Sequence, residues 1–322
     1  MNSIVPALLA GNTVLLKHSD QTPLVAERLS AAAASAGLPA GVFAHVHASH
    51  AAVARLVADP RVAHVAFTGS VEGGRAVQAA ARERFIGVGL ELGGKDAAYV
   101  RDDADVAHAA ATTAEGAFYN AGQSCCAIER IYVHEACYGD FLEAFLAEVR
   151  GLVLGDPRDL ATTLGPLVRV RNAEAVQRQV HAAVAAGATA HLEARDFPAS
   201  ERGLPYLAPQ VLTGVSDAME LMHEETFGPA IGIAPVKDDA EALARINASR
   251  YGLTAALFTA DLDRAEALAS TLEVGTVFAN RCDALDPELA WVGVKDSGRG
   301  CTLSALGFGA FTRPKSLHLR AR

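Results

Sequence analysis

Between residues 12 and 91 the chain alternates between short apolar runs and longer stretches in which apolar residues recur at helical spacing. The pattern predicts strands at residues 13–17, 41–46, 62–70 and 85–92. It predicts helices that begin near Thr22, His50 and Val71. Continuous apolar strands joined by helices are typical of a parallel sheet covered on both faces, so this region is interpreted as a partial doubly wound domain.

A second set of helices and strands is expected after the glycine pair of "ELGGK". The pattern predicts helices at residues 104–119, 138–149 and 239–249, a helix that ends at Gly187, and a strand at 127–134. Residues 193–206 are polar and rich in Pro and Gly, which predicts a surface loop or a hairpin. Residues 315–320, "KSLHLR", alternate in polarity and predict an edge strand, which requires a partner. The whole chain is therefore expected to be α/β.

Size and charge narrow the class of protein. A chain of 322 residues is long enough for two domains, because single cores stop growing near about 250 to 300 residues. There are 28 Lys and Arg against 37 Asp and Glu, giving a formal charge of −9. Since the basic residues form no cluster, we expect no nucleic-acid partner.

The N-terminus and the cysteines exclude further classes. The apolar start is interrupted by Pro6 and Gly11 and lacks a basic region, so neither a signal peptide nor a membrane span is expected, and we predict a cytoplasmic protein. Five cysteines are present, an odd number without a CxxC pair or zinc-type histidine spacing. We therefore expect reduced thiols, no disulfide framework and no metal site.

Two adjacent thiols, Cys125 and Cys126, follow the turn sequence "NAGQ" and precede an apolar strand. A turn between two elements exposes a side chain that the middle of a strand would bury. Because neighbouring side chains point in different directions, at most one thiol can face a substrate. From the residues alone, either thiol is a candidate nucleophile, and a packed role remains open for both.

Three further positions are candidates for chemistry. Glu91 ends an apolar strand and is followed by two glycines, at the kind of strand end where open α/β sheets bind ligands. Ser70 of "FTGS" opens a helix, where free N–H groups suit a phosphate, although Ser is also a common N-cap. In "EETFGP", residues 224–229, two acids precede Phe227 and a Gly-Pro turn, a pattern that also fits a solvated acidic turn.

Taken together, these motifs resemble one family. The segments are, in order, "PALLAGNTVLLK", "QTPL", "AGLPAGV", "FTGS", "ELGGK", "GQSC", "LGP", "EETFGP", "YGLTAALFT" and "KDSGRG". Their order and spacing are similar to those of the NAD(P)-dependent aldehyde dehydrogenase superfamily, from Pro6 to the C-terminus. The resemblance implies a partial Rossmann-type cofactor domain at 1–93, an α/β catalytic domain at 94–293, and a tail at 294–322 with an oligomerisation strand.

The resemblance also implies roles for individual residues. Cys125, two positions after the Gln of the turn, matches the nucleophile, and Cys126 is then a packed neighbour. Glu91 matches the general base. Such an enzyme oxidises an aldehyde to a carboxylic acid through a cysteine thiohemiacetal and a thioester, with hydride transfer to NAD(P)⁺.

Five residues match cofactor-binding positions of the superfamily. Lys17 and Asp20 match positions near the adenosine ribose, and Ser70 matches a position near the pyrophosphate. Glu225 and Phe227 match positions at the nicotinamide ribose and ring. An acid at Asp20 would bind a free 2′-hydroxyl and repel a 2′-phosphate, which favours NAD, with NADP as a possibility.

One departure from the superfamily concerns the N-terminus. Members carry a long segment before "PALLAGNT", including a Trp-Asn-aromatic-Pro motif whose Asn completes the oxyanion hole, and neither Asn2 nor Asn12 matches it. The resemblance therefore implies an N-terminally truncated member with exposed apolar surface on the first domain. We expect such a member to form a homo-oligomer or to pair with a complete homologue. The alternative function is a catalytically impaired fragment that acts as an interaction subunit of such a homologue.

Overall fold

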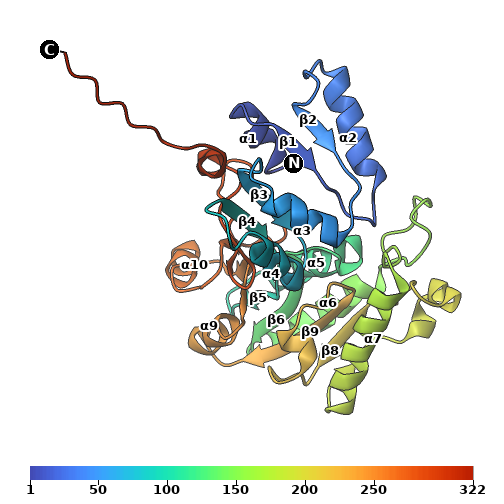
Figure 1. Cartoon of the computed structure of the whole chain (residues 1–322). Helices are drawn as coiled ribbons and strands as arrows, with labels where there is room; N and C mark the ends of the chain where they lie inside the picture. The colour runs from blue at the N-terminus through green and yellow to red at the C-terminus, as the bar shows by residue number, and fades with distance from the viewer. Residues whose placement is uncertain (322) are drawn as a thin grey trace. The chain divides into compact units, whose positions relative to one another are not determined.

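The computed structural model describes residues 1–321, which divide into two compact units. The first unit comprises Met1–Glu91, Leu285–Val292 and the C-terminal part from Gly298. The second comprises Leu92–Ala284 and Gly293–Ser297. Figure 1 shows most of the first unit in blue and the C-terminal part in red.

The elements of the first unit follow the hydrophobic pattern. Its helices are α1 Ile4–Leu9, α2 Leu24–Ser35, α3 His50–Ala58, α4 Val71–Ala80 and the 3₁₀ segment η4 Ala305–Phe311. Its strands are β1 Val14–Leu16, β2 Phe43–His45, β3 His64–Thr68, β4 Gly87–Glu91 and β14 Gly298–Arg299. Each of the four predicted runs contains a strand, and the three predicted helices are present, so these predictions are confirmed.

The strands of the first unit form two small sheets rather than one. β1 pairs with β2, and β3 pairs with β4, both in parallel, while β14 joins β4 in antiparallel. Strand β1 is not covered on both of its faces. Successive side chains of a strand point to opposite faces, and Leu15, on one face of β1, is 53% exposed. Leu9, Leu24 and Val25 are also exposed.

The second unit holds the larger sheet. Its helices are α5 Val106–Phe118, α6 Tyr138–Arg150, α7 Val170–Ala185, α8 Glu220–His223, α9 Asp239–Asn247 and α10 Leu262–Ala269, with 3₁₀ segments η1 Tyr119–Gly122, η2 Ala194–Asp196 and η3 Pro198–Arg202. Its strands are β5 Asp96–Val100, β6 Ile128–His134, β7 Thr189–Ala190, β8 Gln210–Thr213, β9 Ala230–Val236, β10 Tyr251–Gly252, β11 Thr254–Phe258, β12 Thr276–Ala279 and β13 Val294–Lys295. The α/β class and the predicted helices and strand are confirmed.

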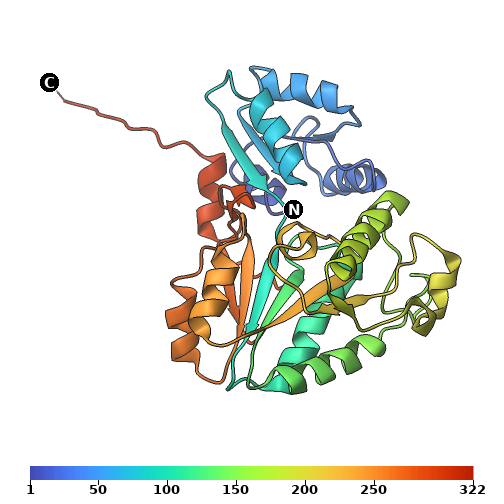
Figure 2. The same cartoon turned by 90° about the horizontal axis from the view of Figure 1, so that it is seen from below.

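Seven strands of this unit form one sheet in the order β12-β11-β5-β6-β9-β8-β7, parallel except for the β7–β8 pair. Every residue of β5 and β11 is buried, as expected for strands covered on both faces. Helices α7 to α10 share one apolar cluster with side chains from one face of the sheet, while α5 and α6 pack against β5 and β6 outside that cluster (Figure 2).

Residues 193–206 form a loop with the 3₁₀ segments η2 and η3, which is one of the two predicted alternatives. Another sequence prediction needs correction. Residues 315–320 form no strand and run as an extended segment (Figure 1), because a strand needs a hydrogen-bonded neighbour and the described residues offer none to this segment. Among residues 1–321, no helix is both long and apolar enough to cross a membrane.

Candidate active site

A tight left-handed turn leads from α5 to the adjacent cysteines. Asn120, Ala121 and Gly122 have φ values of 52°, 57° and 70°, a conformation that costs about 1 kcal/mol or more for residues other than Gly. At Gly122 a side chain would collide with the backbone of Gly228, so only Gly fits. Such strain persists where the surrounding structure holds it, and here it fixes the path of the chain into Cys125.

The two cysteines occupy different environments. Cys126 is buried at 5% exposure, and its thiol donates a hydrogen bond to Oδ1 of Asp283 at 2.7 Å. A hydrogen bond with Cys125, burial and the charge of Asp283 together raise the pKa of Cys126 far above its ordinary value. Cys126 therefore stays protonated near neutral pH and is a poor nucleophile, whereas Cys125 is partly exposed.

The glycine pair Gly93–Gly94 allows Cys125 and Glu225 to approach the same backbone. The N–H of Gly94 donates to Oε1 of Glu225 at 3.1 Å. A Cβ at Gly94 would lie 2.6 Å from the carbonyl oxygen of Cys125, and a Cβ at Gly93 would collide with the carboxylate of Glu225. Any larger residue in this pair would separate them. The structure thus places the backbone of Cys125 and the carboxylate of Glu225 against the same glycine pair.

Behind this contact lies a buried ionic network that the sequence analysis missed. Nζ of Lys95 lies 2.6 Å from Oε2 of Glu129, and their side chains are 0% and 4% exposed. Lys95 also donates to Oγ1 of Thr226 at 2.9 Å, and Glu129 accepts from the N–H groups of Thr226 and Phe227, each at 2.8 Å. Phe227 has a φ of 48°. One sequence feature could have indicated this network: the charged pair Glu129–Arg130 stands inside the otherwise apolar run 127–134.

The same burial alters the titration of Glu225. Burial, followed by the nearby charge of Glu129, raises the pKa of Glu225 to about 7, against an ordinary value of 4.5. The hydrogen bond from Gly94 and the charge of Lys95 oppose this increase. Glu225 is therefore a carboxyl group that exchanges its proton near neutral pH.

The raised pKa makes stability depend on pH. The folded state holds this proton more tightly than the unfolded chain, so the contribution of Glu225 is most favourable below about 4.5 and is lost as the pH rises to about 7. The replacement Glu225→Gln removes the ionisable group, so the protein no longer loses this stability as the pH rises. We expect it to increase the free energy of unfolding by roughly 1 to 3 kcal/mol at pH 8 and to leave it unchanged at pH 4.5, measured by urea denaturation. Glu220→Gln, at an exposed position of α8, is the control; equal effects at both pH values for Glu225→Gln would contradict the prediction.

Glu91 and Ser70 belong to the first unit. Glu91 ends β4, between Thr68 of β3 and Gly298 of β14, and its Oε1 accepts a hydrogen bond from Oγ1 of Thr302 at 2.6 Å. No pattern in the sequence indicated Thr302. Ser70 caps α4 by accepting from the N–H of Gly73 at 3.2 Å, so it is an N-cap, and the helix N-terminus remains a suitable place for an anion.

Lys17 and Asp20 also lie in the first unit. Lys17 directly follows β1 and is half-buried, and Asp20 is exposed in the turn before α2. Glu91 belongs to the first unit and Cys125 to the second.

Comparison with known proteins identifies the family. The model of the aldehyde dehydrogenase family matches residues 1–317. Betaine aldehyde dehydrogenase 2 of Rhizobium meliloti is 38% identical over 97% of this chain and 64% of its own length. Succinate semialdehyde dehydrogenase [NAD(P)+] Sad of Escherichia coli is 37% identical over 97% of this chain and 67% of its own. The crystal structure of an NAD-dependent aldehyde dehydrogenase from Sinorhizobium meliloti superposes with a TM-score of 0.94 at 34% identity, covering 99% of this chain and 63% of that one.

The chain therefore belongs to the aldehyde dehydrogenase family, as the sequence motifs predicted. It spans 64% of the length of the R. meliloti relative.

Proposed function

We propose that this chain carries the chemistry of an NAD(P)-dependent aldehyde dehydrogenase, oxidising an aldehyde to a carboxylic acid. The observation that supports this most directly is the environment of Cys125: a partly exposed thiol after a left-handed turn, beside a buried and protonated Cys126. We propose residues 1–93 as the cofactor domain, 94–293 as the catalytic domain and 294–322 as the oligomerisation tail.

In the proposed reaction, the thiolate of Cys125 attacks the aldehyde carbon. A carbon–sulfur bond forms, the carbonyl oxygen becomes an oxyanion, and the backbone N–H of Cys125 supplies one hydrogen bond to it. The resulting thiohemiacetal loses a hydride as the carbonyl re-forms, leaving a thioester on Cys125. A nicotinamide cofactor supplies the acceptor for that hydride when it is bound.

Glu91 is the proposed general base for hydrolysis. It would take a proton from water, whose oxygen attacks the thioester carbon, and the carbon–sulfur bond breaks to release the acid and regenerate the thiolate. The hydrogen bond from Thr302 to Oε1 orients the carboxylate and leaves Oε2 to accept the proton. Thr302 is thus a positioning residue in this scheme.

The residues present fit a dinucleotide. Around the start of α4, the ring of Phe67 occupies the space that a Cβ at Gly69 or Gly73 would fill, and the helix N-terminus offers N–H groups to a phosphate. We propose Ser70 for the pyrophosphate, Lys17 and Asp20 for the adenosine ribose, and Glu225 and Phe227 for the nicotinamide end. The exposed carboxylate of Asp20 supports NAD over NADP, because it would repel a 2′-phosphate.

A hydride-transfer assay tests the function. We expect the purified chain to reduce NAD, and NADP more slowly, with a panel that includes betaine aldehyde and succinate semialdehyde, followed by the absorbance of the reduced cofactor. Glu91→Gln should lower turnover by about 10²- to 10⁴-fold because water is no longer activated. Glu83→Gln, at an exposed position of the same unit, should leave turnover unchanged. Absence of reduced cofactor with the wild type on every aldehyde would contradict the proposal.

A second candidate function is that of an interaction subunit. The extended segment 315–320 exposes Leu317 and Leu319 at 73% and 88%, and its alternating pattern suits addition to the sheet edge of another chain. The partner would be a second copy of this chain or a complete homologue. Co-purification with such a homologue, together with no turnover alone, would favour this function over the first.

A further inference from the structure

A cluster of two histidines and a carboxylate lies on the first unit, apart from the residues that the proposed reaction uses. Helix α2 carries Glu27 and Ser30 three residues apart, which places them on one helix face. His45 ends β2 and His47 follows two residues later, so an extended chain points both rings to the same side. Because α2 packs against β2, the two pairs meet.

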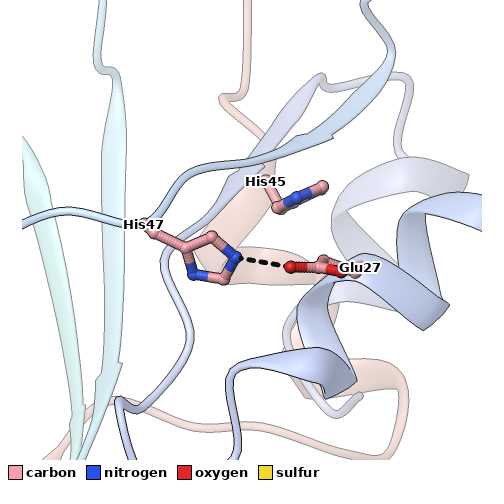
Figure 3. Close-up of side chains that lie close together, drawn as sticks. All are labelled: Glu27, His45 and His47. Carbon is pink, nitrogen blue, oxygen red and sulfur yellow. Dashed lines mark hydrogen bonds and ion pairs between the residues drawn. The ribbon is translucent and has the colours of Figure 1, made fainter.

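The geometry of this cluster is close to that of a metal site. One ligand atom from each of Glu27, His45 and His47 lies within 4.8 Å of the other two. Nε2 of His47 is 3.1 Å from Oε1 of Glu27 (Figure 3). Two ligands of a tetrahedral zinc ion, each about 2.0 to 2.1 Å from the metal, are about 3.3 Å apart, so this pair already has the required separation.

The orientation of His45 adds a second observation. Its Nδ1 lies 2.7 Å from Oγ of Ser30, and the two imidazole rings stand edge to face with centroids 5.4 Å apart. Metal-binding histidines commonly use one ring nitrogen for the metal and the other for an outer hydrogen-bond partner. Ser30 is such a partner, and it leaves the other ring nitrogen of His45 for a metal.

We propose that Glu27, His45 and His47 form a binding site for a divalent transition-metal ion, with Zn²⁺ as the occupant. Two imidazoles and one carboxylate are ligands that zinc prefers, and three protein ligands leave a fourth position for water. Glu27 and His47 are about half exposed, so an ion can enter from solvent without unfolding of the unit. Sequence spacing gave no sign of the site because Glu27 is eighteen residues before His45.

Leu16 of β1 pairs with His45 of β2, so Lys17 follows β1 at the same edge of this small sheet as the metal ligands. The metal site is tested without cofactor, so its failure and the failure of the proposed function can be told apart.

The test is a metal titration of the intact chain. We expect one equivalent of Zn²⁺ to bind in calorimetry, and one of Co²⁺ to give the visible spectrum of a nitrogen- and oxygen-ligated tetrahedral ion. His45→Ala, His47→Ala and Glu27→Gln should each weaken binding at least about 10-fold, and Ser30→Ala by up to about 10-fold.

His50→Ala is the matched control, since His50 is exposed, lies near His47 in the sequence and does not belong to the cluster; its affinity should match the wild type. Two results would overturn the proposal. One is a wild type that binds neither ion. The other is binding that persists in His45→Ala and His47→Ala with a thiolate-to-cobalt charge-transfer band, which would assign the metal to the cysteines.

Discussion

Replacement of Cys125 by Ala is expected to abolish aldehyde oxidation. Without the sulfur no thiohemiacetal forms, so turnover should fall by roughly 10⁴-fold or more, to the background of the cofactor assay. A second readout does not depend on turnover: limited treatment of the wild type with iodoacetamide, followed by peptide mass spectrometry, should label Cys125 well before Cys126. The reason is that Cys126 is buried and its pKa is raised, which leaves little thiolate to react.

Cys126→Ala is the matched control for this prediction. It removes a thiol at the adjacent position but leaves Cys125 on the same turn, so activity should remain within about 10-fold of the wild type. The opposite result, an inactive Cys126→Ala and an active Cys125→Ala, would transfer the nucleophile to Cys126. Faster labelling of Cys126 would point the same way.

The second large effect is expected at the buried ion pair. Lys95→Met removes the cation that faces Glu129 and leaves a carboxylate at 4% exposure without its charged partner. Breaking a buried pair from one side typically costs about 3 to 5 kcal/mol, because the remaining charge stays out of water. The free energy of unfolding in urea should fall by this amount, and Thr226 should lose a hydrogen-bond donor in the segment that carries Glu225.

An exposed ion pair provides the comparison. Arg82 and Glu83 are 76% and 82% exposed at their side chains, so Arg82→Met should change the free energy of unfolding by no more than about 0.5 kcal/mol. If Lys95→Met were as mild as Arg82→Met, the network around Glu129 would not be holding the loop 224–229 in place. Loss of cofactor affinity without loss of stability would likewise contradict the structural role.

The local pattern of apolar and polar residues was sufficient to predict most of the secondary structure. The strands around Leu16 and Phe67 and the helices that begin at His50 and Val71 follow from apolar period and end signals, which depend only on near neighbours. The family followed from ordered motifs, and the comparisons confirmed it. The pairing of the strands could not be predicted in the same way. β3 pairs with β4 and β1 pairs with β2, and this choice depends on backbone groups that are distant in the sequence.

The sequence by itself determined that this chain is an α/β protein of the aldehyde dehydrogenase family and nominated Cys125 and Cys126 as neighbouring thiols. Only the tertiary structure decided how their environments differ. The thiol of Cys126 is buried and donates a hydrogen bond to Asp283, which is 157 positions away in the sequence. The same holds for the contact of Glu225 with Gly94 and for the meeting of Glu27 with His47. Burial, charge and hydrogen bonding set the reactivity of a side chain, and folding supplies all three from segments that are remote in the sequence.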